Sequence, residues 1–143
     1  MSKSIEEMKT EVKQAIQAGE VDAVCSFLSG NAELLRATTF HGTWLHLAAK
    51  LGNVELVQRL IGIGAEVNAE DEFGGTPIAI AAAKGHADVI NCLLENGAET
   101  TTRQPDDNPI FNAIYESNLD IIRLFMSAGV DANVVYRSVT GNL

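Results

Sequence analysis

The sequence predicts an all-α solenoid of stacked helix-turn-helix units, with protruding turn or hairpin loops between them. The first observation is a ten-residue phrase that occurs twice, as TWLHLAAKLG at 43–52 and TPIAIAAAKG at 76–85. The second is a Gly or Ser that recurs after 33 or 32 residues: Gly19, Gly52, Gly85 and Ser117. The third is an apolar stretch at helical spacing after each of them. A fixed period of this length is typical of repeat arrays, in which each unit packs mainly on its neighbours.

The first helix of each unit carries its own start and stop signals. Thr43 and Thr76 are suited to cap a helix, because a hydroxyl oxygen accepts from a free amide of the first turn. Pro77 then falls at the first helical position, where no amide donor is missed. Gly52 and Gly85 are expected to end the helix, since glycine adopts left-handed backbone angles at little cost.

A second helix is expected after each of these glycines. Its apolar residues recur at helical spacing, as Val54, Val57, Leu60 and Ile61 in one unit and Val89, Ile90, Leu93 and Leu94 in the next. Gly64 and Gly97 are expected to end it. The stretch VNAEDEFGG then predicts an extended return loop tipped by a tight turn.

The two ends of the array are expected to differ from its middle. We place the repeats at about 4–36, 37–69, 70–102 and 103–135, with 136–143 as the start of a further repeat or a C-terminal tail. The stretch 5–16 is charged on one side, as suits an N-terminal cap. At the other end Ile114, Leu124 and Phe125 are expected to lack a polar cap. Either the chain is a trimmed version of a longer array, or this end packs on itself, a second copy or a partner.

These phrases resemble the ankyrin repeat, whose pattern runs Asp-x-x-Gly-x-Thr-Pro-Leu-His-x-Ala-Ala-x-x-Gly-His, then an apolar helix, then Gly-Ala-x-x-Asn. The best copy is DEFGGTPIAIAAAKGHADVINCLLENGAE at 71–99. The copy before it keeps nine pattern positions: Thr43, Leu45, His46, Ala48, Ala49, Gly52, Gly64, Ala65 and Asn68. The resemblance covers about residues 5–135 and implies a single ankyrin-repeat domain over 1–143.

The outer copies depart from the pattern. The last has Asn108 for Thr and Phe111 for His. The first keeps only its second half, over 15–28, with Asn31 where a Gly is expected.

The chain offers no set of residues for catalysis or metal binding. The resemblance implies that His46 and His86 bond backbone and loops, and His41 precedes a tight turn. The acidic run at 70–72 lacks the spacing of a calcium loop. No phosphate-binding or nucleophile-elbow motif occurs. We therefore expect a protein that is not an enzyme, with no cofactor and no metal.

Composition indicates which classes of partner and which cellular compartment are favoured. The 143 residues carry a formal net charge of −9 and 46% hydrophobic residues, as suits one folded domain. This charge disfavours binding to nucleic acid or to anionic membranes, and it favours a protein with a basic patch. The two cysteines, Cys25 and Cys92, are predicted to be buried thiols. The N-terminus MSKSIEEMKT lacks an apolar signal core, so we expect a cytoplasmic protein.

The resemblance implies that a partner binds the face formed by the turn tips and the first helices. The candidate residues on it are Thr39, Phe40, Lys50, Leu51, Glu70, Asp71, Glu72, Phe73, Lys84, Arg103, Gln104, Asp107, Tyr115 and Glu116. Phe40 and Phe73 are one period apart and should stand at neighbouring tips, with Tyr115 lower on the face. Exposed aromatics near acidic side chains are typical of an interface. The alternative is that each Phe folds down over its own turn.

We therefore expect a protein-protein interaction module that binds through an acidic, aromatic-containing concave face. One alternative is an immunity or inhibitor protein that neutralises a basic toxin or enzyme. Another is a scaffold or targeting fragment of a longer ankyrin array. A monomer is expected, with end-to-end association through the uncapped C-terminal repeat as an alternative.

Trp44 is a departure between the two copies of the opening phrase, because it stands where the later copy has Pro77. The favoured interpretation is that its ring covers the seam between the first two repeats. The alternative is that the ring extends the aromatic face near Phe40.

Overall fold

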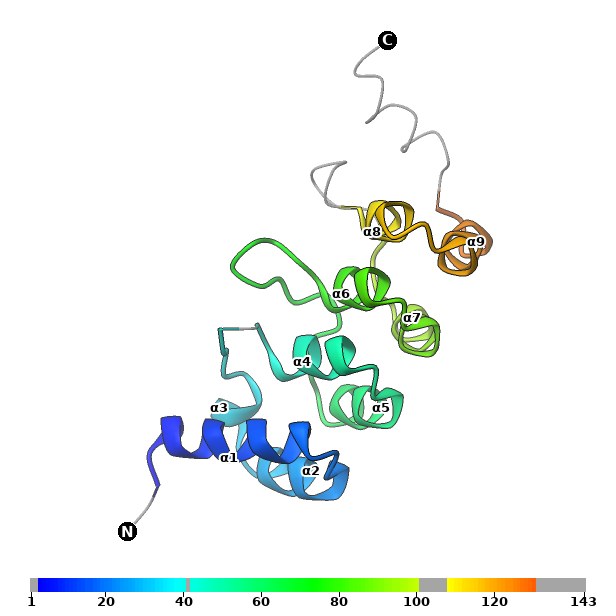
Figure 1. Ribbon diagram of the computed structural model, residues 1–143. Coiled ribbons are helices and arrows are strands. Elements are labelled where there is room, and N and C mark those ends of the chain that lie inside the picture. The colour runs from blue at the N-terminus through cyan, green and yellow to red at the C-terminus, as the bar shows by residue number, and fades with distance from the viewer. Residues whose placement is uncertain (1–2, 41, 101–107, 131–143) are drawn as a thin grey trace.

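The computed structural model describes residues 3–40, 42–100 and 108–130, and its helices stack one pair upon the next (Figure 1). The helices are α1 (Ile5–Gln17), α2 (Val21–Ser29), α3 (Ala32–Leu35), α4 (Trp44–Leu51), α5 (Val54–Gly62), α6 (Pro77–Lys84), α7 (Ala87–Glu95), α8 (Pro109–Tyr115) and α9 (Leu119–Ser127). One row contains α4, α6 and α8, and a second contains α5, α7 and α9. Loops project from the first row (Figure 1). The predicted all-α solenoid is confirmed.

The predicted helix boundaries follow from the local signals. The hydroxyl oxygens of Thr43 and Thr76 each accept a hydrogen bond from an amide of the first turn, at 3.4 Å. Pro77 occupies the first position of α6. Gly52 and Gly85 end α4 and α6 with φ of 74° and 77°, in the left-handed region. These capping predictions are confirmed.

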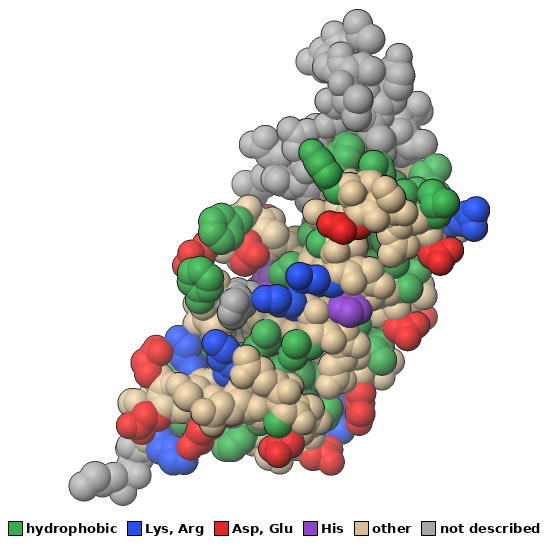
Figure 2. Space-filling view, in the orientation of Figure 1, with side chains coloured by type: hydrophobic (Ala, Val, Ile, Leu, Met, Phe, Trp, Pro, Cys, Tyr) green, Lys and Arg blue, Asp and Glu red, His purple; other side chains and the backbone are tan. Residues whose placement is uncertain are grey.

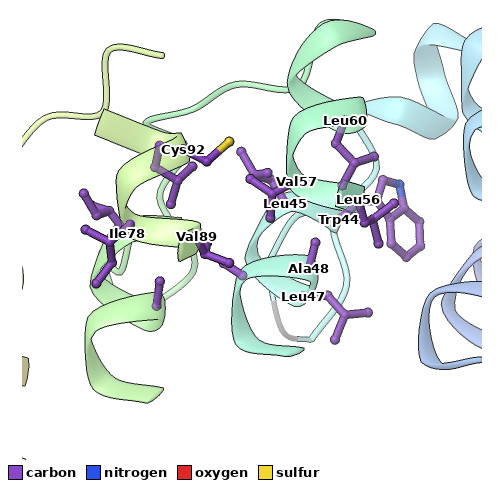
Figure 3. Packing of buried hydrophobic residues seen from close by; sticks show 14 of the residues in the cluster. Trp44, Leu45, Leu47, Ala48, Leu56, Val57, Leu60, Ile78, Val89 and Cys92 are labelled. Atoms are coloured by element: carbon purple, nitrogen blue, oxygen red, sulfur yellow. The ribbon is translucent and has the colours of Figure 1, made fainter. Parts of the chain in front are cut away.

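One continuous apolar core runs through the stack. Figure 3 shows Val57 of α5 and Val89 and Cys92 of α7 meeting between two successive helix pairs. In the first row, four small residues have no exposed surface: Ala48, Ala49, Ala81 and Ala82. Because these side chains are short, α4 and α6 can approach closely.

Trp44 joins the first unit to the second. Its side chain is 1% exposed, and its indole N–H donates to the carbonyl oxygen of Leu34 at 2.8 Å. Leu34 lies in α3, a short helix that the sequence analysis did not predict. Asn31 begins α3 by accepting from the Leu34 amide at 3.0 Å. The favoured interpretation of Trp44 as cover for this seam is confirmed.

Ile114, Leu124 and Phe125 were expected to lie at an uncapped end of the array, and this expectation is wrong for Phe125. This side chain is fully buried, because α9 packs on α7 and α8 and directs it into the common core. Leu124 is half-buried and Ile114 is 37% exposed. The segment 136–143 lies outside the described residues. Among the helices that the structure describes, none has the length and apolar character needed to cross a bilayer.

His86 fastens α6 and α7 to the end of α4. Its Nε2 lies 3.0 Å from the carbonyl oxygen of Lys50. Its ring also lies so close to Gly52 that an added Cβ would be 2.6 Å away. Gly52 is therefore needed both for its backbone angle and for this close approach. Gly19 has a similar φ of 75°, but no atom lies within 4 Å of an added Cβ there.

Gly52→Ala is expected to destabilise the protein more than Gly19→Ala does. At Gly19 the expected loss in free energy of unfolding is about 1 kcal/mol, because the alanine must adopt left-handed backbone angles and contacts nothing else. At Gly52 it must also displace the His86 ring, which raises the expected loss to about 2–3 kcal/mol. Urea denaturation followed by circular dichroism measures both losses. Equal losses would show that the His86 contact does not constrain the stack.

Trp44→Phe is expected to lower the free energy of unfolding by about 1–3 kcal/mol, because it leaves the Leu34 carbonyl without its donor. Trp44→Ala should cost about 3–5 kcal/mol, since the ring volume is lost as well. The chain has one tryptophan, so both variants are followed by far-ultraviolet circular dichroism rather than fluorescence. A loss below about 0.5 kcal/mol for Trp44→Phe would contradict a structural role for the hydrogen bond.

Candidate protein-binding face

The loop before α6 is held by the carboxylate of Asp71. Its Oδ1 accepts from the amides of Phe73 at 2.9 Å and Gly75 at 2.8 Å. The Asp71 amide in turn donates to the Gly75 carbonyl at 2.8 Å. These bonds close the tip of the loop on itself. The Phe73 side chain is left 84% exposed.

The loop before α4 is closed by Thr39 and Gly42. Their amides and carbonyls are paired at 2.7 and 3.0 Å, and the Thr39 hydroxyl donates to the Gly42 carbonyl at 3.0 Å. Phe40 projects from this loop and is 80% exposed. The two loops lie close together, since a Cβ added at Gly42 would lie 3.2 Å from the Cβ of Asp71. Both side chains keep most of their surface exposed, which favours the interpretation that they point outward.

The ends of the first helices supply the rest of the face. Leu51 at the end of α4 is 47% exposed, and Tyr115 at the end of α8 is 88% exposed. Lys50, Lys84 and Glu116 are exposed at the same ends of α4, α6 and α8. Figure 2 shows apolar side chains projecting along the loop edge, with Lys or Arg side chains on the surface next to them.

The candidate residues differ in what they can offer a partner. Glu70 and Glu72 are exposed, whereas Asp71 is half-buried and its carboxylate is used by its own loop. We therefore assign Asp71 to loop architecture. Arg103, Gln104 and Asp107 lie outside the described residues.

The histidines have structural partners. His46 is fully buried, and its Nδ1 accepts from the Thr43 amide at 3.1 Å. Its Nε2–H is thereby directed to the carbonyl oxygen of Gly75, 2.8 Å away in the next loop. The predicted bonding of His46 and His86 to backbone is confirmed, and His41 lies outside the described residues.

Cys25 and Cys92 are free and buried, as predicted. Burial, with the neighbouring Glu95 charge, raises the pKa of the Cys92 thiol above its ordinary value. Over the ranges that the structure describes, no three His, Cys, Asp or Glu side chains are placed to hold a metal ion.

A cavity of about 310 Å³ lies behind the loops and was not foreseen from the sequence. Leu35, Trp44 and Ala65 contribute to its apolar part, and Arg36 and Glu66 lie on its polar part. No residue pattern predicts it, because it depends on how α3 sits against the segment that follows α5.

Asp71→Ala is expected to lower the free energy of unfolding by about 1 kcal/mol and to loosen the loop, because two amides lose their acceptor. Asp71→Asn should cost less, since it retains an oxygen acceptor. Glu72→Ala is the control, as this neighbouring carboxylate is exposed. Hydrogen exchange at the Phe73 and Gly75 amides measures the loosening. Equal exchange in Asp71→Ala and Glu72→Ala would contradict the role of Asp71.

The comparisons with known proteins bear on the family. No curated protein matches the chain in a sequence search. A family model described as ankyrin repeats (3 copies) matches residues 12–104 and again residues 45–136, which together span most of the chain. The stacked helix pairs, with their threonine caps, left-handed glycines and bonded histidines, agree with that match. The chain belongs to the ankyrin-repeat family.

Proposed function

We propose that this protein binds another protein through its recognition face, the surface formed by the loop tips and the ends of the first helices. Its described candidate residues are Thr39, Phe40, Lys50, Leu51, Glu70, Glu72, Phe73, Lys84, Tyr115 and Glu116. Ankyrin repeats are generally protein-protein interaction modules and typically have no catalytic activity. That general role supports the proposal.

The observation that carries the proposal is the exposure of three aromatic side chains on this one face. Phe40, Phe73 and Tyr115 are 80, 84 and 88% exposed. Each of them exposes a large apolar area to water. Burial of that area by a partner would contribute favourable free energy to binding. Aromatic side chains are also the commonest anchors of protein interfaces.

Charge supports a partner with basic residues near the tips. The whole chain carries a net charge of −9, and Glu70 and Glu72 are exposed beside Phe73. Such a field speeds the approach of a cationic surface. Neutralisation of a basic toxin or enzyme is the specific form of this role that the net charge favours.

Phe73→Ala and Tyr115→Ala are each expected to weaken binding of the physiological partner by roughly 30-fold, as removal of an interface anchor does. The partner is captured from an extract of the source cells on the immobilised full chain and identified by mass spectrometry. Its affinity for each variant is then measured by calorimetry.

Phe27→Ala is the matched control, because Phe27 is an exposed phenylalanine on α2, away from the recognition face. It should leave the affinity within about twofold of the wild type. A partner held equally by all four proteins, or the absence of any saturable partner, would contradict the proposed face. Thermal unfolding of each variant checks that a lost partner is not a lost fold.

A further inference from the structure

Three basic residues lie at the seam between α4 and α6 on the recognition face. The Nε2 of His86 lies 3.0 Å from the carbonyl of Lys50, which brings the end of α4 against the start of α7. Lys84 is the last residue of α6, two positions before His86. Figure 2 shows Lys or Arg side chains beside a histidine in the middle of this face. We call Lys50, Lys84 and His86 the seam cluster.

The lysines of this cluster form no ion pair within the described part of the chain. The ion pairs seen there join Lys3 to Glu11, Lys9 to Glu6 and Arg59 to Asp22. Neither Lys50 nor Lys84 pairs with a described carboxylate, although the chain has 19 Asp and Glu residues against ten Lys and Arg. Lys13, Arg36 and Arg123 also lie outside these ion pairs, so Lys50 and Lys84 are distinguished by their place on the recognition face, where a partner can reach them.

The repeat pattern does not account for the cluster. Counted from the glycines that end the helices, Lys50 corresponds to Ala83, and Lys84 corresponds to Leu51. The two lysines therefore occupy different positions of their units, and the stacking of α4 and α6 places them at neighbouring helix ends. Both lysines lie in the last turn of their helices, where a cation complements the helix dipole. That role leaves their ammonium groups free to pair with carboxylates of another molecule.

We infer that the seam cluster receives carboxylates of the protein partner, so that the docking segment carries acidic as well as basic residues. This inference rests on the proposed function. The loop tips, with Glu70 and Glu72, favour cationic residues of the partner, whereas Lys50 and Lys84 favour anionic ones. The tips and the seam lie on one face, so the two signs fix the direction in which the segment lies. Such complementarity governs register and association rate more than raw affinity.

A library of random twelve-residue peptides displayed on phage tests the inference on the full-length chain. The selected peptides are expected to combine Asp or Glu with an aromatic or apolar residue and Lys or Arg. One selected peptide, labelled with a fluorophore, is then titrated by anisotropy. Lys50→Glu and Lys84→Glu should each weaken it roughly tenfold at low salt, because an attractive pair becomes a repulsive one.

Two variants serve as controls. Arg123→Glu makes the same charge change on α9, outside the recognition face, and should alter the affinity less than twofold. Lys84→Arg keeps the charge and should retain most of the binding. The weakening by Lys84→Glu should also shrink as salt is raised, since exposed charges are screened.

The outcomes separate this inference from the proposed function. If Phe73→Ala weakens peptide binding but Lys50→Glu and Lys84→Glu do not, the proposed recognition face is supported and the proposed role of the seam cluster is overturned. If the lysine variants weaken peptide binding and Phe73→Ala does not, the role of the seam cluster is supported and the role of Phe73 as an aromatic anchor is overturned. Selected peptides without Asp or Glu would overturn the seam cluster, and a failure to select any saturable binder would overturn both.

Discussion

The close stacking of the first helices is the constraint on which the other features depend. Alanines without exposed surface lie in α4 and α6, and the two helices are in contact. Two histidines then fasten one unit to the next by reaching backbone carbonyls, His46 to Gly75 and His86 to Lys50. Because a carbonyl is present whatever the residue, these fasteners leave the side chains on the exposed face free to vary. The stack therefore fixes the backbone and leaves the recognition face open to selection for binding.

Architecture and recognition are divided among neighbouring residues of the same loop. Asp71 uses its backbone amide and its carboxylate in hydrogen bonds that close the turn. Phe73, two residues later, projects into water. A rigid tip lowers the conformational entropy that binding must overcome, so an exposed aromatic on it is a better anchor than one on a loose loop. The same division holds at the helix ends, where the buried Ala49 precedes the exposed Lys50 and the half-buried Ala83 precedes the exposed Lys84.

The sequence predicted those features that short-range chemistry decides. Thr76 as a cap and Gly85 as a left-handed stop follow from a hydroxyl, an amide and a missing Cβ within one turn, so a short pattern suffices. Features that need two distant segments were missed or misjudged. The helix α3 is held partly by Trp44, ten residues from the carbonyl that its indole meets. Phe125 was expected at an open end, but the packing of α9 against α7 buries it. On the candidate site, the sequence marked Asp71 as a partner contact, and only the loop geometry shows what its carboxylate holds.

The net charge of the chain and the arrangement of charges on the recognition face point to different features of a partner. The net charge of −9 describes the field far from the protein, where individual groups are not resolved, and there it favours a cationic partner. At contact distance the relevant quantity is the order of charges along the surface, since screening limits each group to about 8–10 Å. Lys50 and Lys84 are 34 residues apart in the chain, and the stacking of α4 and α6 places them at neighbouring helix ends. A uniformly basic segment would be drawn to the tips and repelled at the seam. A segment with both signs would satisfy the two regions in one orientation, which makes the order of its charges the feature by which this face discriminates among partners.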